Sequence, residues 1–510
     1  MQQRDVNEWL NQLERQLAQS VGGDLLEVSS SNQQCNIREE SMFKWNIEQL
    51  KAATDGDLVG PLADAVYFDS ISTDTRTLKP GALYIAIKGQ NFDGHDFVEQ
   101  AVKQGAAAVL ISSDVDPIVP GVMVEDTRIA LGQFAKWHRQ QMPVKKLIAV
   151  TGSNGKTSVK TLLQGIFSLS GKTLATEGNL NNDFGVPRTL LNLRPEHEYA
   201  VIEMGANHPK EIAYLTALAC PDIAIINNAG AAHLEGFGSL QGIIDTKGEI
   251  FQGLNQMGDE SNGFAILNTD SPGYEDWQKM LAELGVKHKI EFGTKPHADV
   301  QLVGVETVNT SNETMTFDLI ESGVAHPMEM PMLGFHNAMN AAACAAIARA
   351  AQLEWTYITQ GISAFTGVAG RLQKKRIQNG WLIDDSYNAN AESVKAGIDV
   401  LCSLEGDAIV CLGAMGEVGE TSKAVHDDIA EYAKNKGVKH LFVYGEDAQF
   451  MPQTFGQGAA YFIKHSEIVD EVTKKIQSEG KALLNILVKG SRSARMEEVA
   501  KPLLEKFKTQ

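Results

Sequence analysis

The chain has 510 residues, which is too long for one hydrophobic core and suggests about three domains. Hydrophobic residues make up 43% and charged residues 21%, as in an ordinary globular protein. The net charge of −19 argues against a general binder of nucleic acids or anionic membranes, because both are polyanions. With five scattered cysteines, no long apolar run and no secretory core at the N-terminus, we expect a cytoplasmic protein that does not insert into membranes.

The first segment, residues 1–44, differs from the rest of the chain. Apolar residues at helical spacing between Val6 and Leu17 precede a polar run at 29–34. The segment is either an accessory helix with a loose linker or an extension upstream of a start near Met42. Residues 45–143 then alternate short apolar strands with turns, as at 78–87.

Two longer regions alternate buried strands with helical patterns, which predicts parallel sheets covered by helices. Strands are expected at 199–204 and 222–227 in the first of these regions, and at 381–385, 407–413, 440–445 and 483–489 in the second. The expected fold class is therefore α/β with three domains. They are a small α/β domain (45–143), a central parallel-sheet domain of phosphate-loop type (144–353) and a C-terminal α/β domain (354–510), after the extension 1–44.

A phosphate-binding loop is the most informative motif. An apolar strand leads into Gly152-Ser153-Asn154-Gly155-Lys156-Thr157-Ser158, and a helical pattern follows. Small residues let backbone N–H groups surround phosphate oxygens, and the helix N-terminus points at them. Lys156 would reach the terminal phosphates and Thr157 would bind Mg²⁺. The common loop has Gly where this chain has Val150, so the shorter spacing argues against a generic ATPase.

Polar residues at strand ends and on helices extend this site. Glu203 ends a strand, where a carboxylate can hold Mg²⁺ or make an ordinary capping contact. His233 follows the next strand, and Lys247 opens a helical pattern; alone, they read as a structural histidine and a solvated lysine. Asn337 and Asn340 share one face of an Ala-rich helix, where their amides could read an adenine edge or cap the helix.

In this order the motifs resemble the Mur ligase family, which contains ATP-dependent enzymes that form amide bonds in peptidoglycan assembly. They are the loop, Glu-Met-Gly at 203–205, Ala-His-Leu-Glu at 232–235, Lys-Gly-Glu-Ile at 247–250 and His-Asn-x-x-Asn at 336–340. Two further segments, 72–81 and 88–97, resemble the nucleotide-sugar domain of that family. Four others are similar to the branch that adds D-alanyl-D-alanine: 179–187, 370–372, 384–390 and 488–497. The resemblance covers the chain from about Trp45 to the C-terminus.

The resemblance implies a UDP-binding domain, a central ATPase domain and a dinucleotide-fold-like C-terminal domain that brings the amino substrate. The reaction would join D-alanyl-D-alanine to the carboxylate of a UDP-linked muramoyl tripeptide through an acyl phosphate. ATP would be a substrate, Mg²⁺ a cofactor and Lys247 a carbamylated metal ligand. We expect a monomer. The third residue of the tripeptide, diaminopimelate or lysine, stays open.

The same resemblance implies roles for individual residues. Thr157, Glu203, His233 and carbamylated Lys247 would hold the metal, and Lys156 would act on the phosphates. Arg371 would touch the γ-phosphate, Asp385 the ribose, and Asn337 and Asn340 the adenine. The UDP part of the substrate is assigned to Asp74, Thr75 and Arg76, and the muramoyl peptide to Asn179, Asn181 and Asn182. The dipeptide site is assigned to Ser386, Tyr387, Asn388, Ser491 and Arg492.

Three alternatives were weighed. The sister enzyme that adds diaminopimelate or lysine carries Asp-Asn-Pro-Arg in its C-terminal domain, and this chain has Lys489-Gly-Ser-Arg-Ser493 instead. A folate polyglutamylating ligase lacks a UDP-type domain like residues 72–97. A nucleotide-gated switch ATPase would need the loop and Glu203 but gives no reason for Lys247 or Arg371.

Overall fold

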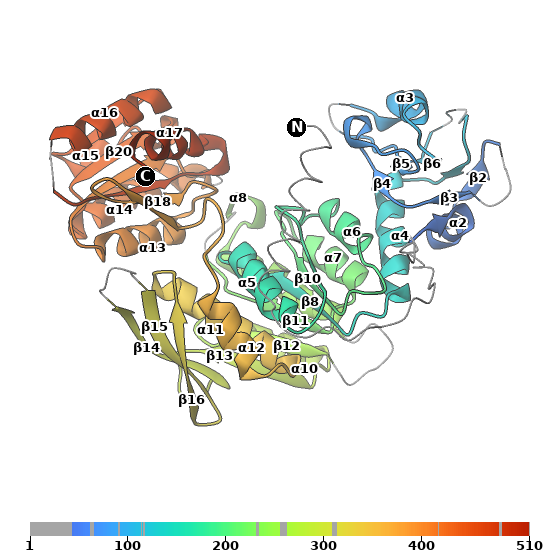
Figure 1. Ribbon diagram of the computed structural model, residues 1–510, viewed down its shortest axis with the longest axis horizontal. Helices are drawn as coiled ribbons and strands as arrows, with labels where there is room; N and C mark the ends of the chain where they lie inside the picture. The colour runs from blue at the N-terminus through green and yellow to red at the C-terminus, as the bar shows by residue number, and fades with distance from the viewer. Residues whose placement is uncertain are drawn as a thin grey trace, which may run out of the picture. The chain divides into compact units, whose positions relative to one another are not determined.

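The computed structural model describes residues 43–61, 66–89, 92–113, 115, 118–230, 234–254, 263–308, 314–416, 418–478 and 482–508. The helix expected between Val6 and Leu17, and with it nearly all of the extension 1–44, lies outside these residues. One compact unit runs from Lys44 to Gln510. Within it the strands form three sheets of five, nine and six members and a small two-stranded pair (Figure 1).

The first region is built on the five-stranded sheet, with strand order β2-β7-β6-β5-β4. The strands of this region are β1 (Trp45–Asn46), β2 (Asp57–Val59), β3 (Tyr67–Phe68), β4 (Ile71–Ser72), β5 (Leu83–Ile85), β6 (Ala108–Ile111) and β7 (Gly121–Met123). Of these, β1 and β3 form the two-stranded pair. Its helices are α2 (Ile47–Thr54), α3 (Val98–Lys103) and α4 (Thr127–Gln141), with short turns η1 (Thr75–Thr77) and η2 (Gly94–Phe97). The short strands and turns expected from the sequence are confirmed.

Helix α4 joins this region to the central one, because it packs on α6 and α7. His138 on α4 is fully buried; its Nδ1 accepts a hydrogen bond from the indole N–H of Trp45 (3.0 Å), and its Nε2 donates to the carbonyl oxygen of Leu193 (3.0 Å). Burial lowers the pKa of His138 to about 4, so the ring is neutral near pH 7. The neutral His138 ring is therefore hydrogen-bonded both to Trp45 of the first region and to Leu193 of the central region.

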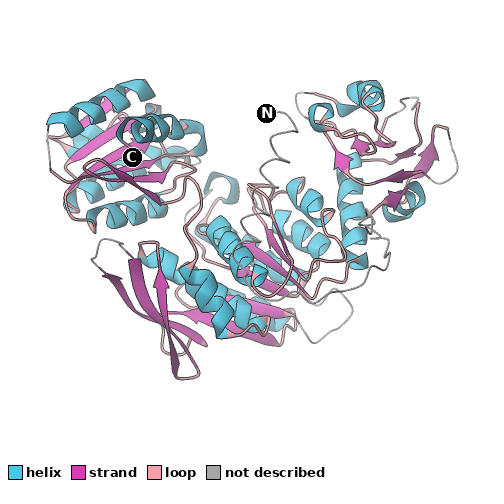
Figure 2. Cartoon of the chain, in the orientation of Figure 1, coloured by secondary structure: helices cyan, strands magenta, loops and turns pink. Residues whose placement is uncertain are grey.

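The central region contains the nine-stranded sheet, with order β16-β15-β14-β13-β12-β11-β8-β10-β9. Its strands are β8 (Lys146–Thr151), β9 (Thr173–Ala175), β10 (Tyr199–Glu203), β11 (Ile223–Ile226), β12 (Phe264–Asn268), β13 (His288–Gly293), β14 (Val300–Val308), β15 (Thr314–Glu321) and β16 (Val324–Met330). Strands β8 to β13 are parallel, as expected, but β14, β15 and β16 pair antiparallel with one another. Figure 2 shows these strands, and the sequence analysis missed their antiparallel extension.

The helices of this region are α5 (Lys156–Ser168), α6 (Gly185–Leu190), α7 (Glu211–Ala219), α8 (Leu234–Phe237), α9 (Leu240–Gly248), α10 (Tyr274–Glu283), α11 (Phe335–Ala350) and α12 (Trp355–Ser363), with the turn η3 (Glu249–Gly253). Helix α11 is the expected buried Ala-rich helix, and its small side chains let it approach α5 and β13 closely. Helix α12, which follows the expected boundary at residue 353, packs on α5 and β16.

The C-terminal region contains the six-stranded sheet, with order β17-β18-β22-β19-β20-β21. Its strands are β17 (Gln373–Ile377), β18 (Gly380–Asp385), β19 (Asp407–Gly413), β20 (His440–Tyr444), β21 (Ala459–Phe462) and β22 (Leu484–Lys489). Its helices are α13 (Ala391–Cys402), α14 (Ser422–Asn435), α15 (Met451–Phe455), α16 (His465–Ser478) and α17 (Glu497–Phe507), with turns η4 (Gly419–Thr421), η5 (Glu446–Ala448) and η6 (Arg492–Ala494). The strands expected in this region are confirmed to within one residue at each end.

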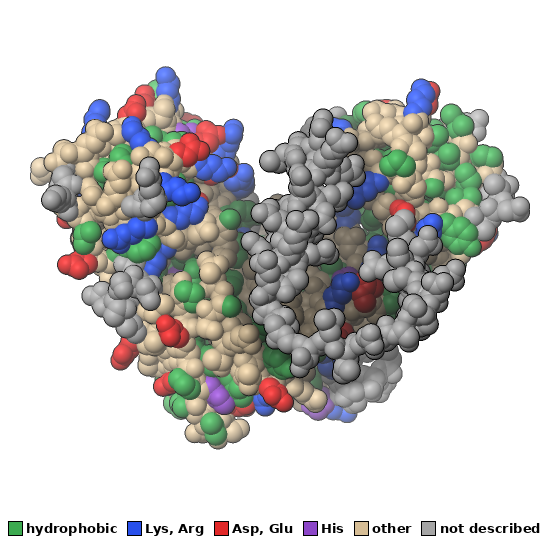
Figure 3. Space-filling model, in the orientation of Figure 1, with side chains coloured by type: hydrophobic (Ala, Val, Ile, Leu, Met, Phe, Trp, Pro, Cys, Tyr) green, Lys and Arg blue, Asp and Glu red, His purple; other side chains and the backbone are tan. Residues whose placement is uncertain are grey.

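Two hydrophobic clusters cover the two faces of this sheet. Alternate residues of one strand, such as Ile486 and Leu487, enter different clusters, because successive side chains of a strand point to opposite faces. Helices α13 and α14 contribute to one cluster, and α16 and α17 to the other. On the face shown in Figure 3, Lys and Arg side chains gather over this region, although the net charge of the chain is −19.

Candidate active site

The carboxyl ends of three central strands bring the main candidate residues together. Strand β8 lies between β10 and β11, and all three run parallel. Glu203 stands opposite Val150, and Ile226 stands opposite Thr151. The phosphate loop after β8, Glu203 at the end of β10 and the asparagines after β11 therefore share one edge of the sheet.

The shape of the phosphate loop is fixed by its neighbours. Gly152 and Gly155 have φ angles of 152° and 81°, which favour glycine, and a Cβ on Gly155 would fall 2.5 Å from the Nδ2 atom of Asn227. The N–H groups of Ser153 and Asn154 donate to the backbone and side-chain oxygens of Asn228. The donors available for an anion are thus those of the first turn of α5, from Lys156 onward.

Lys156 folds back onto this loop, and its Nζ donates to the carbonyl oxygen of Gly152 (2.6 Å). Burial lowers the pKa of Lys156, and the Glu203 carboxylate opposes that shift. The hydroxyl-bearing Thr157 is buried in the first turn of α5. Ser158 lies in the same turn and is half-buried.

The two carboxylate oxygens of Glu203 have different surroundings. Oε1 accepts a hydrogen bond from the Nδ2 atom of Asn181 (2.8 Å), and the Glu203 N–H donates to the Thr176 hydroxyl (2.9 Å). Oε2 is buried and has no hydrogen-bond partner among the residues that the structure describes; 2% of Glu203 is exposed. A buried carboxylate oxygen that has lost its water needs a partner, so this atom is suited to a cation.

Asn181 was assigned to the muramoyl peptide, and its observed contact is with Glu203. Its carbonyl oxygen also accepts from the N–H of Gly205 (2.8 Å). Asn179 contributes the carbonyl that accepts from the Asn181 N–H. The Asn182 side chain accepts from the N–H of Gly185 (2.9 Å) at the start of α6. The segment 179–182 thus lies beside Glu203 through Asn181.

Lys247 is buried near the end of α9, with 4% of its surface exposed. Burial and the nearby charge of Lys156 lower the pKa of Lys247 well below its usual value. No acidic side chain pairs with it in the part of the chain that the structure describes. The expected reading of a solvated helix lysine is therefore wrong. His233 lies outside the described residues.

Asn337 and Asn340 are both buried on α11. The Oδ1 atom of Asn340 accepts from the Nδ2 atom of Asn227 (2.9 Å), which also donates to the Asn154 carbonyl oxygen (3.0 Å). Asn337 donates to the carbonyl oxygen of Leu333 (2.7 Å). Asn227 was missed as a site residue, and its place directly after a strand neighbouring β8 was the available signal.

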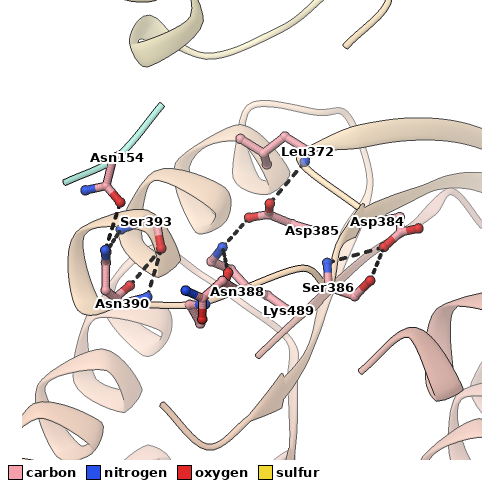
Figure 4. Close-up of polar contacts among 10 residues, drawn as sticks. Asn154, Leu372, Asp384, Asp385, Ser386, Asn388, Asn390, Ser393 and Lys489 are labelled. Carbon is pink, nitrogen blue, oxygen red and sulfur yellow. Dashed lines mark hydrogen bonds and ion pairs between the residues drawn. The ribbon is translucent and has the colours of Figure 1, made fainter. Parts of the chain in front are cut away.

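A second cluster follows strand β18 (Figure 4). The Oδ2 atom of Asp385 lies 2.5 Å from the Nζ atom of Lys489, and its Oδ1 atom accepts from the Leu372 N–H (3.1 Å). Burial raises the pKa of Asp385, and the Lys489 ammonium opposes that shift. The guanidinium of Arg371 lies 4.2 Å from the ring centroid of Tyr387. The structure thus brings Arg371, Tyr387 and Asp385 together.

The remaining dipeptide candidates make internal contacts in the same region. The Ser386 hydroxyl donates to Asp384 (2.6 Å), the Asn388 side chain accepts from the Ala389 N–H (2.9 Å), and the Ser491 hydroxyl donates to the Ala414 carbonyl oxygen (2.6 Å). Arg492 pairs with Glu497 at 2.9 Å.

The phosphate loop also contacts the start of α13 (Figure 4). The Nδ2 atom of Asn390 donates to the Oδ1 atom of Asn154 (2.8 Å), and the Nδ2 atom of Asn154 donates to Glu392 (3.2 Å). The loop therefore has direct partners in the C-terminal region.

In the first region, Asp74 caps the short turn η1 and pairs with Arg76 at 2.6 Å. Hydrogen bonds from Arg76 lower the pKa of Asp74 to about 2. Thr75 is buried. None of these three lines the nearby cavity of about 210 Å³.

That cavity is lined by Trp45, Ser70, Ile71, Ser72, Thr77, Lys79 and Ala82 from the first region and by Arg188, Asn192 and Arg194 from the central one. Its three cationic side chains, Lys79, Arg188 and Arg194, suit an anion. The sequence analysis missed them, because they come from segments about 110 residues apart.

Among the residues that the structure describes, no helix combines the length and the apolar character needed to cross a bilayer. In the same part of the chain, no three histidine, cysteine or acidic side chains gather as a metal cluster.

Comparisons with known proteins agree with this geometry. Three family models match: "Mur ligase family, catalytic domain" at residues 67–139, "Mur ligase middle domain" at 150–348 and "Mur ligase, glutamate ligase domain" at 370–492. The UDP-N-acetylmuramoyl-tripeptide–D-alanyl-D-alanine ligase of Escherichia coli K12 is 40% identical over 91% of this chain and 99% of its own length.

Solved structures show the same likeness. MurF from Acinetobacter baumannii superposes with a TM-score of 0.84, at 32% identity over 91% of this chain and 99% of that one. MurF ligase from Thermotoga maritima in complex with ADP has a TM-score of 0.75, at 25% identity over 86% of this chain and 98% of that one. The chain therefore belongs to the Mur ligase family.

Proposed function

We propose that this chain is an ATP-dependent ligase that joins D-alanyl-D-alanine to the terminal carboxylate of UDP-N-acetylmuramoyl-tripeptide, giving the pentapeptide precursor of peptidoglycan. The relatives that match over nearly their whole length carry this activity in their names. The observation that carries the proposal is the shared sheet edge, where a phosphate loop stands beside a buried carboxylate oxygen that has no hydrogen-bond partner in the described part of the chain.

The reaction balances in two steps. An oxygen of the tripeptide carboxylate attacks the γ-phosphorus of ATP, and the bond to ADP breaks, which leaves an acyl phosphate. The amine of D-alanyl-D-alanine then attacks the acyl carbon, phosphate leaves with the former carboxylate oxygen, and the amine loses a proton. The first step converts a poor electrophile into one with a good leaving group.

The residues of the phosphate loop bind the nucleotide in this proposal. The first turn of α5, from Lys156 to Ser158, directs N–H groups at the phosphates, and the preceding residues 152–155 give the loop its shape. Lys156 releases the Gly152 carbonyl and turns to the β- and γ-phosphates. Arg371 adds positive charge at the γ-phosphate, where negative charge moves during transfer.

The residues present fit a magnesium ion. The Oε2 atom of Glu203 is buried with no hydrogen-bond partner within the described ranges, and Thr157 lies in the first turn of the adjacent helix. Glu203, Thr157, His233 and a carbamylated Lys247 would hold the metal. When bound, Mg²⁺ supplies positive charge that offsets the repulsion between the carboxylate and the phosphates.

Carbamylation of Lys247 fits its surroundings. The uncharged amine is the form that adds CO₂, and the buried site without an acidic partner favours that form. The product carries carboxylate oxygens, which a hard cation prefers to nitrogen.

The adenosine part of ATP is assigned to α11 and β18. Asn337 and Asn340 face the adenine, and Asp385 contacts the ribose. Because Asn340 also accepts from Asn227, it links the base site to the phosphate loop. Adenine recognition and loop geometry are therefore coupled in this proposal.

The two other substrates occupy opposite sides of the nucleotide site. Asp74, Thr75 and Arg76 shape the turn at the uridine diphosphate, and the cationic cavity beside it receives the diphosphate. Asn179, Asn181 and Asn182 lie near the muramoyl peptide, next to Glu203. Ser386, Tyr387, Asn388, Ser491 and Arg492 form the dipeptide side.

The decisive test is ligation with purified components. The chain is incubated with ATP, Mg²⁺, D-alanyl-D-alanine and either of two UDP-tripeptides, ending in diaminopimelate or in lysine, and the products are weighed by mass spectrometry. We expect a product heavier by one dipeptide minus water, together with ADP and phosphate. Phosphate release that needs neither the tripeptide nor the dipeptide would instead favour a switch ATPase.

A further inference from the structure

Lys489 carries a charge at one of the most buried positions of the C-terminal sheet. It is the last residue of β22, and only 2% of its side chain is exposed. Its β22 register neighbours are Asp385 on β18 and Leu412 on β19, so its backbone is held on both sides. Resting on the proposed function, we propose that Lys489 is a positioning residue that holds Arg371 in place for phosphoryl transfer.

The first link runs from Lys489 to the loop after β18. Its Nζ atom lies 2.5 Å from the Oδ2 atom of Asp385 and 2.9 Å from the carbonyl oxygen of Asn388 (Figure 4). One ammonium therefore bonds both the first and the last residue of the segment 385–388.

The second link runs from Asp385 to the residue after Arg371. The Oδ1 atom of Asp385 accepts from the Leu372 N–H at 3.1 Å, and Leu372 has a φ angle of 47°. A leucine adopts this left-handed conformation only at a cost in free energy, so it persists only where surrounding contacts hold it. The hydrogen bond from Asp385 is such a contact, and it fixes the backbone at the base of the Arg371 side chain.

The third link holds Arg371 from its other side. The Tyr387 N–H donates to the carbonyl oxygen of Gly370 (3.1 Å), and the Tyr387 ring lies 4.2 Å from the Arg371 guanidinium. Because Lys489 bonds the carbonyl of the next residue, Asn388, it steadies this ring as well. Residues 370–372 are therefore clasped by the segment 385–388, which is tied to Lys489.

A purely stabilising role explains this arrangement less well. Burying a lysine and an aspartate costs free energy, and well-packed apolar side chains of similar size often serve stability equally well or better. The Lys489–Asp385 pair does hold the segment 385–388 in one conformation. It also connects Arg371 to the strand end that carries Ser491, the candidate dipeptide residue two positions after Lys489.

The test is a double-mutant cycle between Lys489→Gln and Arg371→Ala in the full chain. We expect Lys489→Gln to lower kcat about 10- to 100-fold, as a small misplacement of a catalytic group does. The affinity for ADP, measured by calorimetry, should fall by a smaller factor than kcat, because ADP keeps the ribose that Asp385 contacts but lacks the γ-phosphate that Arg371 contacts. The double variant should be no slower than Arg371→Ala alone, because both changes remove one function.

Lys436→Gln is the matched control. It breaks another Lys–Asp pair of the same region, with Asp399 at 2.6 Å, in which both side chains are about half exposed. Its kcat should be unchanged. If Lys489→Gln does not fold, Lys489→Met/Asp385→Asn removes both buried charges, and its non-additivity with Arg371→Ala decides.

Three results would overturn the inference. They are an unchanged kcat in a folded Lys489 variant, a double variant whose kcat falls by the product of the two single factors, and an ADP affinity that falls as much as kcat. The unaltered chain is assayed beside the variants. If it forms no ligation product, the proposed function fails and this inference with it. If it forms the product but the two substitutions lower kcat independently, this inference alone is overturned.

Discussion

Among the described residues, buried charged groups lack partners at the carboxyl edge of the central sheet and are paired at that of the C-terminal sheet. At the central edge, the Oε2 atom of Glu203 has no partner among the described residues, and no acidic side chain there pairs with Lys247. At the C-terminal edge, Asp385 and Lys489 satisfy each other, and Asp384 accepts from Ser386. All four of these side chains, Glu203, Lys247, Asp385 and Lys489, belong to buried residues, so burial alone does not explain the difference.

The difference separates binding from positioning. An unpaired buried charge costs stability and persists where a ligand completes it, so the central edge is arranged to receive cation and phosphate. A paired buried charge fixes geometry without needing a ligand, so the C-terminal edge holds side chains in place. Each prediction below changes one side of this contrast.

The largest effect is expected from Lys247→Ala at the central edge. Removing the buried amine removes the proposed carbamate ligand, so ligation should fall by at least about 10²–10³-fold. Added formate or acetate should restore part of the rate by supplying carboxylate oxygens. Lys434→Ala, an exposed lysine on α14, serves as control and should leave ligation unchanged. Full activity of Lys247→Ala would remove the carbamate from the account.

Two isosteric changes compare the edges by stability. Asp385→Asn should lower the free energy of unfolding by about 3–5 kcal/mol, because it leaves the Lys489 ammonium buried without its counter-ion. Glu203→Gln should change it by no more than about 1 kcal/mol, because Oε2 has no hydrogen bond to lose and the contact with Asn181 can remain. Urea unfolding of both variants measures this. Equal losses in the two variants would contradict the contrast.

The cationic cavity should behave like the central edge, as a site completed by its ligand. Lys79→Met or Arg188→Met removes one cation from its lining, and each should raise the KM for the UDP-tripeptide about tenfold, with kcat little changed. Initial rates at varied UDP-tripeptide measure this. Arg128→Met outside the lining, where Arg128 pairs with Asp183, is the control. A fall in kcat with constant KM would place the substrate elsewhere.

The smallest effect concerns two histidines that repeat the contrast. Both nitrogens of the buried His138 are bonded, whereas the buried Nε2 atom of the half-buried His336 has no hydrogen-bond partner among the described residues; burial lowers the pKa of each to about 4. Between the unfolded value near 6.5 and pH 4 the unfolded chain binds more protons, so stability is present above about pH 6.5 and is lost as pH falls.

His138→Gln tests this for the bonded ring, because an amide can make both hydrogen bonds but does not titrate. The variant should lose about 1 kcal/mol less than the unaltered chain between pH 6.5 and 5.5. Thermal unfolding at both pH values measures this, with the exposed His288→Gln as control. An unchanged acid dependence in His138→Gln would show that His138 does not carry it.

Motifs and strands within short stretches of the chain could be predicted from the sequence, whereas contacts between distant segments could not. The phosphate loop, Glu203 at a strand end and the Ala-rich helix follow from short patterns. The strands expected at 199–204, at 222–227 and in the C-terminal region begin and end within one residue of the observed ones. The hydrogen bond between Asn181 and Glu203, the bridge from Asn340 through Asn227 and the pair of Asp385 with Lys489 join segments 22 to 113 residues apart. No periodicity reports such contacts. The antiparallel strands β14 to β16 were missed, although the regular alternation of buried and half-buried residues along β15 is typical of a strand with one covered face.

The central claim is that the tripeptide carboxylate is activated by direct attack on the γ-phosphate of ATP. It is tested by labelling that carboxylate with ¹⁸O and measuring the mass of the phosphate released during ligation. The account predicts one ¹⁸O atom in each phosphate, because the former carboxylate oxygen leaves with it when the amine attacks. Unlabelled phosphate, released while the pentapeptide product accumulates, would contradict the acyl phosphate and with it the role assigned to the central edge.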